Sequence, residues 1–283
     1  MYQAQISRSN PSAFVFLIDQ SASMSGDWAG EPGKNKAQAL ATILNRLIQN
    51  LVLRCAKEEG IRDYYEVAVI GYGARVASAL GRSLGGADLV PISRLGEAPL
   101  RVEERTKRVD DGVGGLIDQT VKLPIWVDPQ ADNGTPMCQA LDRTISILRP
   151  WVAAHASSFP PIVINITDGE PNDGDPTAKA QELMSLATSD GQVLLFNVHI
   201  SSAPGQPIVF PAGESVLPDD HAQRLFRMSS VLPPYMRSAA NQEQLSAEET
   251  SRGFAFQSDA VSVIQLLDIG TRPSNMADVA QLE

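Results

Sequence analysis

Short continuous apolar runs alternate along the chain with stretches whose apolar residues recur at helical spacing. The runs are rich in β-branched and aromatic residues, which favours strands buried on both faces. They are Ala13–Ile18, Tyr65–Tyr72, Pro161–Thr167, Val193–Ile200 and the short Gly253–Phe256. The helical stretches are Lys34–Cys55, Cys138–Val152, Thr177–Thr188, a segment beginning near Asp219, and Ala260–Asp268. Alternation of this kind predicts an α/β fold, a doubly wound and mostly parallel central sheet flanked by helices, Rossmann-like in outline.

The periodic signal weakens between residues 74 and 132. Glycines interrupt short apolar pieces there, and the mixed-charge run Glu103–Arg108 is most simply a solvated face. We expect a strand plus an irregular hairpin or loop, inserted into a single domain of residues 1–283 with its core at about 13–270. The apolar loop Gly205–Pro211 is expected to fold back onto the sheet edge; the alternative is a second interaction patch.

Composition narrows the class of function. Of 283 residues, 43% are apolar, which argues against wholesale disorder, and the formal charge of -10 disfavours nucleic acid and anionic membranes as partners. No apolar window approaches the roughly 18 residues of a membrane helix. The N-terminus carries no recognisable leader, so we expect a cytoplasmic protein. Cys55 and Cys138 fit neither a disulfide framework nor a zinc motif.

Carboxylates and hydroxyls follow the predicted strands where each one ends. Asp19, Ser21 and Ser23 come after the first strand, Asp168 follows another, and Thr135 precedes a helix. Ligands of a doubly wound sheet bind at the carboxyl ends of its strands, so these side chains should converge. Hard oxygen donors without His or thiolate suit Mg²⁺, with Mn²⁺ or Ca²⁺ possible, and are poor for zinc. The simpler alternative is that Asp19 and Ser21 only cap the turn before the next helix.

Three short motifs resemble those of the von Willebrand factor type A (vWA) domain. They are Asp-x-Ser-x-Ser at residues 19–23, Gly134-Thr135-Pro136 and Thr167-Asp168-Gly169, and the likeness spans roughly Ala13 to Gly270. The resemblance implies a metal-ion-dependent adhesion site (MIDAS) in which the two serines and Thr135 bind metal through their hydroxyls. It also implies that both aspartates bind directly or through water, and that a carboxylate of a partner protein completes the coordination.

Asp168-Gly169-Glu170-Pro171 most resembles stand-alone bacterial members encoded beside tellurium-resistance, kinase and phosphatase genes. This likeness implies an intracellular bacterial signalling or stress-response component. Its partner would be a protein supplying an Asp or Glu to the metal, for example a kinase, a phosphatase or another product of the same operon. Movement of the final helix, Ala260–Asp268, could couple to metal coordination in such a protein.

Four residues near these motifs are candidates for a partner-binding rim: Trp28, Met137, Glu170 and Asp173. Trp28 lies in a loop flanked by glycines, where it either anchors a partner or packs over its own loop. Glu170 and Asp173 either shape partner choice or are ordinary turn acids. Trp126 and Trp151 are expected in the core.

The first hypothesis is therefore a non-enzymatic, cation-dependent protein-binding module. The second is a Mg²⁺-dependent phosphoryl-transfer or hydrolytic enzyme on a related sheet. No phosphate-binding Gly-rich loop supports the second, and no Lys or Arg stands near the first strand end before Lys34. A third is a scaffold whose metal stabilises the fold while the inserted region at 74–132 does the binding.

Overall fold

A mostly parallel β-sheet forms the centre of the molecule. The computed structural model describes residues 1–28, 33–81, 84, 86–110, 116–202 and 205–271. Within these residues the central sheet has eight strands, in the order β13-β14-β12-β9-β1-β4-β5, with β6 also paired to β4. Neighbours from β4 to β14 are parallel, whereas β5, β6 and β13 pair antiparallel. The order, with β1 at the centre and the chain winding outward both ways, is that of a doubly wound fold.

The strand bounds agree closely with the apolar runs. The central strands are β1 (Ser12–Asp19), β4 (Tyr65–Tyr72), β9 (Ile162–Thr167), β12 (Leu194–Ile200) and β14 (Phe254–Ser258). The short edge strands are β5 (Val76–Ser78), β6 (Val90–Pro91) and β13 (Ile208–Val209). All eight residues of β1 are buried, as expected for a strand covered on both faces. The antiparallel pairing of β13 with β14 confirms that the apolar loop folds back onto the sheet edge.

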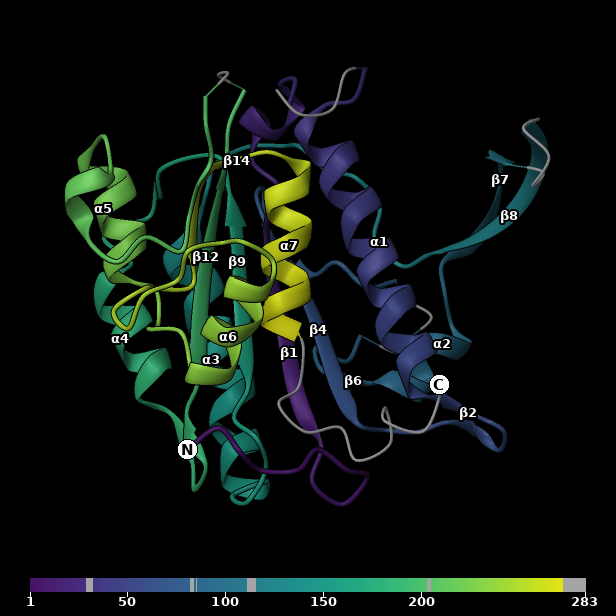
Figure 1. Cartoon of the computed structure of the whole chain (residues 1–283), viewed down its shortest axis with the longest axis horizontal. Coiled ribbons are helices and arrows are strands. Elements are labelled where there is room, and N and C mark those ends of the chain that lie inside the picture. The colour runs from purple at the N-terminus through teal and green to yellow at the C-terminus, as the bar shows by residue number, and fades with distance from the viewer. Residues whose placement is uncertain (29–32, 82–83, 85, 111–115, 203–204, 272–283) are drawn as a thin grey trace.

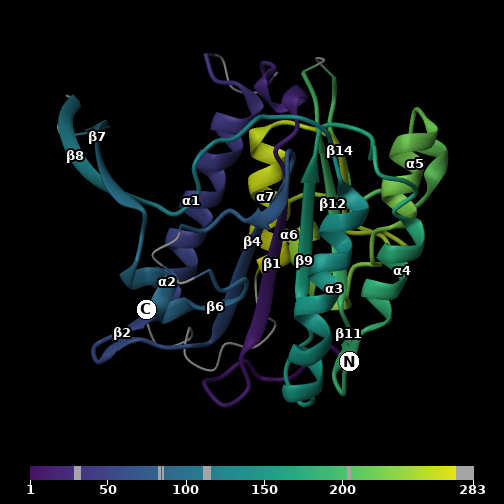
Figure 2. The same ribbon diagram turned by 180° about the vertical axis from the view of Figure 1, so that it is seen from behind.

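Helices cover both faces of the sheet (Figures 1 and 2). The helices are α1 (Lys36–Cys55), α2 (Ile92–Glu97), α3 (Met137–Ala154), α4 (Thr177–Ser185), α5 (Asp220–Arg227), α6 (Pro234–Gln242) and α7 (Ala260–Thr271). Phe14 and Phe16 of β1 point into a core shared with α1, α2, α6 and α7. Val15 and Leu17 point into the opposite core, shared with α3, α4 and α5. Period-two alternation along one strand thus builds two hydrophobic cores.

Several details differ from the sequence prediction. The first helix begins at Lys36 rather than Lys34, because Asn35 and Gln38 form a capping box at its start. The fourth helix ends at Ser185, and the chain then forms a small hairpin of β10 (Ala187–Thr188) and β11 (Gly191–Gln192). Another small hairpin, β2 (Ala56–Lys57) with β3 (Gly60–Ile61), follows α1. Helices α2 and α6 were not predicted separately.

The inserted region contains a long two-stranded ribbon instead of irregular structure. Strands β7 (Arg101–Asp110) and β8 (Leu116–Ile125) pair antiparallel over ten residues each. The ribbon extends away from the sheet beyond α1 in both views (Figures 1 and 2). Its described side chains are mostly exposed on both faces, so no apolar alternation marks these strands in the sequence. Residues 111–115 between the strands lie outside the described residues.

The core positions expected for two tryptophans are confirmed. Trp126 and Trp151 are 2% and 5% exposed. Cys55 is buried and Cys138 half-buried, and both are free thiols on helices. Among the helices of the described residues, none combines the length and apolarity needed to cross a membrane.

Candidate functional site

Three loops meet at the carboxyl ends of β1 and β9. The first follows β1 and contains a short 3-10 helix, Ala22–Ser25. The second, residues 132–136, precedes α3, and the third follows β9. Ala22 N–H donates to Asn133 O at 2.8 Å, and Asn172 N–H donates to Thr135 O at 3.1 Å. Backbone hydrogen bonds therefore hold the three loops in one cluster before any side chain is considered.

Asp19 is the deepest of the predicted ligands, with 1% of its surface exposed. Its Oδ1 accepts from Ser21 N–H at 2.8 Å, and its Oδ2 accepts from the Thr167 hydroxyl at 2.6 Å. Burial raises the pKa of Asp19, and the nearby Asp168 raises it further, whereas the hydrogen bonds of Ser21 and Thr167 oppose the shift. Ionisation of Asp19 is thus less favourable than that of a free aspartate, and a nearby cation would favour it.

Hydroxyl groups link the first loop to Asp168. Ser21 Oγ lies 2.9 Å from Ser23 Oγ, and Ser23 Oγ donates to Asp168 Oδ1 at 2.7 Å. The Asp168 side chain is fully buried, although the residue as a whole is half-buried. The two serines and Asp168 that the sequence grouped by motif are therefore in direct hydrogen-bonded contact.

Thr135 reaches the same place from the second loop. Its Oγ1 and the Oγ of Ser23 lie 3.9 and 4.0 Å from the point where a Cβ on Gly169 would stand. Thr135 itself is 7% exposed. All five residues predicted as metal ligands are thus brought to one edge of the sheet.

Local backbone chemistry explains the Asn133-Gly134 pair. Asn133 has φ of 66°, in the left-handed region that Asn tolerates better than most residues. Gly134 has no positive φ; a Cβ there would lie 1.9 Å from Asn172 Nδ2, so glycine is needed for close approach.

Lys36 is a residue that sequence reasoning missed at this site. Its Nζ lies 2.6 Å from Asp168 Oδ2, and the side chains of the pair are 8% and 0% exposed. Lys36 is the first residue of α1, seventeen positions after Asp19 in the chain. The only signal for it in the sequence is its place beside the Asn35 cap, which does not reveal where a long side chain points.

Two predicted rim residues are not on the surface. Trp28 is 2% exposed, and its Nε1 donates to Ser258 O at 2.9 Å, so it packs against the end of β14 instead of anchoring a partner. Met137 is fully buried in the core beneath α3, with Asn165 Nδ2 3.9 Å from its sulfur. Both side chains are large and apolar, so the hydrophobic effect favours their burial in the core over exposure at the edge of the site.

The two acidic rim candidates differ from each other. Glu170 is exposed beside Asp168. Asp173 is half-buried and accepts from the N–H groups of Cys138 and Gln139 at 3.1 and 2.9 Å. Asp173 therefore satisfies the free N–H groups at the start of α3. Roles of both residues in partner choice remain predictions.

A buried polar network lies in the sheet below the site. Tyr72 donates to Asn165 Oδ1 at 2.7 Å, and Asn165 Nδ2 donates to Asn197 Oδ1 at 2.9 Å. Asn197 in turn donates to Ser229 Oγ at 3.0 Å. All four residues are fully buried, and the network joins β4, β9 and β12 to the end of α5. Each member satisfies its neighbour, as buried polar groups must.

Two histidines pack together near the site. The rings of His199 and His221 lie 5.8 Å apart, and His199 also stacks on Phe256 at 4.6 Å. Burial lowers the pKa of His199 to about 4, with a smaller contribution from His221. Its stacked position at the half-buried end of β12 gives His199 a structural role.

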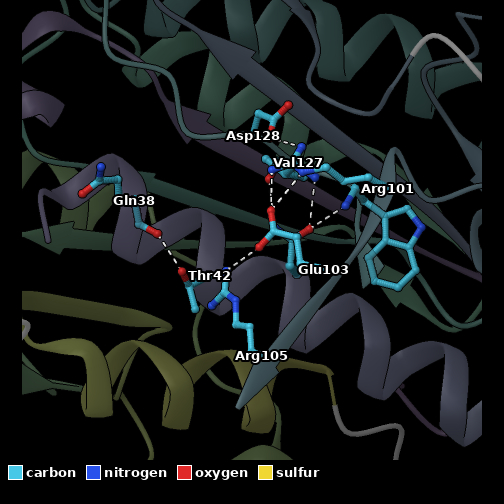
Figure 3. A network of polar contacts seen from close by, with 9 residues as sticks. Gln38, Thr42, Arg101, Glu103, Arg105, Val127 and Asp128 are labelled. Atoms are coloured by element: carbon cyan, nitrogen blue, oxygen red, sulfur yellow. Dashed lines mark hydrogen bonds and ion pairs between the residues drawn. The ribbon is translucent and has the colours of Figure 1, made fainter. Parts of the chain in front are cut away.

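The root of the ribbon forms a second polar cluster, against α1 (Figure 3). Glu103 accepts hydrogen bonds from Arg101 and Arg105, both at 2.9 Å, and Arg101 also pairs with Asp128 at 2.6 Å. A groove of about 260 Å³ lies between this root and α1, with Thr42 on its helical wall. None of the five predicted metal ligands lines this groove.

The donor set at the strand ends fits a hard divalent cation. It consists of two carboxylates and three hydroxyls, with no thiolate or imidazole among the five residues. Within the described residues, no group of three or more His, Cys, Asp and Glu is arranged to hold an ion. A metal here would depend on hydroxyl oxygens and water to complete its coordination, as hydroxyl-rich sites for Mg²⁺ and Mn²⁺ do.

Comparison with known proteins gives structural neighbours only. No family model and no curated protein matches the chain. Among solved structures, the chain is similar to the manganese-loaded TRAP protein of Plasmodium vivax, with 15% identity over 92% of this chain and 72% of that one, TM-score 0.45. It is also similar to proximal thread matrix protein 1 from the mussel byssus, with 12% identity over 86% of this chain and 48% of that one, TM-score 0.44.

A third neighbour is VWA2, the ArnB paralog from Sulfolobus acidocaldarius, with 12% identity over 68% of this chain and 35% of that one, TM-score 0.36. The chain spans less than half of the length of the byssus and Sulfolobus proteins. At these identities and TM-scores, the likenesses carry neither a metal nor a partner over to this chain.

Proposed function

We propose that this chain is a non-enzymatic protein-binding module that holds a divalent cation, Mg²⁺ in the first place, at the ends of β1 and β9. The observation that carries the proposal is the convergence of Asp19, Ser21, Ser23, Thr135 and Asp168, from three separate loops, into one buried or hydrogen-bonded set. Capping alone does not explain this convergence, because Asp19 and Ser21 would cap a turn without Thr135 or Asp168 nearby.

The residues of such a site would have two different roles, as neutral hydroxyl ligands and as charged carboxylate ligands. Ser21, Ser23 and Thr135 offer neutral oxygens, and the buried Asp19 is oriented by Thr167 and by Ser21 N–H. A bound divalent ion with mostly neutral ligands supplies an electrophilic centre for an incoming carboxylate. An Asp or Glu side chain of a partner protein is the ligand that this charge pattern would select. In this way an acidic chain can bind an acidic partner.

Direct metal binding tests the proposal. Mn²⁺ titration followed by electron paramagnetic resonance should show one site in the wild-type chain and none in Asp19→Asn. Asp27→Asn is the matched control, because Asp27 is an exposed carboxylate in the same loop. Unchanged binding by Asp19→Asn, or equal losses in both variants, would remove the basis of the proposal.

Recognition of a carboxylate needs its own measurement. With Mn²⁺ bound, a peptide containing Glu should displace metal-bound water and lower the water-proton relaxation rate, whereas the same peptide with Gln should not. If the Glu and Gln peptides have the same effect, the metal site does not recognise acidic side chains.

The alternative enzymatic function is separately testable. A Mg²⁺-dependent phosphoryl-transfer enzyme would turn over a generic phosphatase substrate with added Mg²⁺ or Mn²⁺, and Asp19→Asn would abolish that turnover. We expect no turnover by either protein. The cytoplasmic location and the bacterial signalling role, with a kinase, phosphatase or operon-encoded partner, belong to the same proposal and await identification of the partner.

A further inference from the structure

We propose that the Lys36 ammonium group is a permanent positive charge within the strand-end site. It weakens the binding of a divalent ion and makes the metal-loaded site bind an anionic partner more strongly. This inference rests on the proposed function and describes how the same site would be regulated. It concerns the contact between Lys36 and Asp168, in which an ammonium group occupies one oxygen of a predicted metal ligand.

The geometry of Asp168 supports the proposal. Its Oδ1 accepts the Ser23 hydroxyl at 2.7 Å, and its Oδ2 faces Lys36 Nζ at 2.6 Å. Both oxygens are therefore engaged by the chain itself. A metal ion that binds Asp168, directly or through water, must therefore lie close to the fixed positive charge of Lys36.

The position of Lys36 is not explained by the stability of α1. Asn35 accepts from Gln38 N–H at 2.8 Å and closes a capping box, so the helix start is satisfied without the lysine side chain. A positive charge at the first residue of a helix also opposes the helix dipole. Burial of the ammonium, with the whole residue 6% exposed, adds a desolvation penalty. The contact with Asp168 is what compensates for both effects.

Charge balance gives the functional consequence. Asp19, Asp168 and Lys36 together leave one net negative charge when both carboxylates are ionised. A bound divalent ion then makes the site net positive by one charge, whereas the same site without Lys36 would be neutral. Close charges in a poorly hydrated site interact strongly. Lys36 thus lowers metal affinity, and it leaves the loaded site with a positive charge that a partner carboxylate would neutralise.

The test compares Mn²⁺ affinity in the wild-type chain, Lys36→Met and Arg46→Met. Methionine keeps the length of the lysine side chain without its charge. Arg46 is an exposed residue of the same helix, so its variant removes the same formal charge far from buried contacts. We expect Lys36→Met to bind Mn²⁺ at least tenfold more tightly than the wild type, and Arg46→Met to bind within twofold of it. Calorimetry gives both affinities directly.

The outcomes separate this inference from the proposed function. Wild-type binding of Mn²⁺ with equal affinity in Lys36→Met overturns the role of Lys36 and leaves the metal site standing. Binding of Mn²⁺ by Lys36→Met but not by the wild type supports a Lys36 ammonium group that occupies the metal position. Absence of binding in both proteins overturns the metal site and the inference together.

A second readout addresses the carboxylate step. In Lys36→Met loaded with Mn²⁺, a Glu-containing peptide should bind at least threefold more weakly than in the loaded wild type, because the site has lost its surplus positive charge. Equal or tighter peptide binding would overturn this half of the proposal. Lys36→Gln serves the same comparisons if the methionine variant does not fold.

Discussion

Replacement of Asn165 by leucine should destabilise the sheet, because it leaves two buried polar groups, the Tyr72 hydroxyl and Asn197 Oδ1, without their main hydrogen-bond partner. The change removes the acceptor of the Tyr72 hydroxyl at 2.7 Å and the donor to Asn197 Oδ1 at 2.9 Å. Tyr72 would keep a longer contact to Ile166 O at 3.4 Å and its side-chain interaction with Thr167, which replace the lost bond only in part. Each unsatisfied buried group costs about 1–3 kcal/mol, so the loss is about 4 kcal/mol in all.

Part of that loss is recovered because leucine buries more apolar surface. A buried leucine contributes about 2 kcal/mol, so the free energy of unfolding should fall by about 2 kcal/mol. That corresponds to a drop in Tm of roughly 3–4 °C for a chain of this size. Urea denaturation followed by circular dichroism measures the first quantity, and thermal melting measures the second.

The sharper assay is the effect of Tyr72→Phe in the two backgrounds. In the wild type, Tyr72→Phe leaves Asn165 Oδ1 without its donor and should lower the free energy of unfolding by about 1 kcal/mol. In Asn165→Leu it removes a hydroxyl that has already lost its main partner, so it should be neutral or stabilising. Tyr235→Phe is the matched control, since the buried Tyr235 hydroxyl has no hydrogen-bond partner in the described part of the chain. Equal destabilisation by Tyr72→Phe in both backgrounds would refute the coupling across the sheet.

Three further predictions follow from contacts described above. Burial lowers the pKa of His199 to about 4, so as the pH falls the unfolded chain takes up a proton near pH 6.5, before the folded chain does. The free energy of unfolding should therefore fall by about 3 kcal/mol between pH 6.5 and 4. Urea denaturation at a series of pH values should show a smaller fall in His199→Phe. Trp28→Phe should lower the free energy of unfolding by about 1 kcal/mol through loss of the Ser258 hydrogen bond, and an unchanged Tm would contradict the burial of this indole. Asp173→Asn should destabilise by about 0.5–1 kcal/mol at the start of α3 while Mn²⁺ affinity stays the same, and a large loss of affinity would instead make Asp173 part of the metal site.

The strand–helix order and the approximate element bounds could be predicted from sequence because hydrophobic periodicity records which face of an element is buried. The pattern of β1 shows this most clearly, since successive residues enter two different cores. The convergence of Asp19, Thr135 and Asp168 was also predictable, because the winding of the sheet puts the ends of neighbouring strands at one edge.

Features that depend on long side chains or on distant partners were not predictable. The Lys36 ammonium reaches Asp168 across 132 positions of sequence, and no local pattern specifies such a pairing. Trp28 is buried because the end of β14 provides an acceptor for its indole, which a loop sequence cannot indicate. Asn165 and Asn197 sit inside apolar runs, where their pairing becomes visible only once β9 and β12 are in register.

The ribbon of β7 and β8 has a consequence for how the protein can vary. Its two strands leave and rejoin the body side by side, because Leu100 N–H donates to Ile125 O at 2.7 Å. The body therefore meets residues 101–124 as a closed loop whose length does not alter the register of any sheet strand. Shortening, lengthening or replacing this arm would leave the arrangement of the side chains at the ends of β1 and β9 intact. The arm can thus change in length or sequence independently of the sheet that positions Asp19 and Asp168.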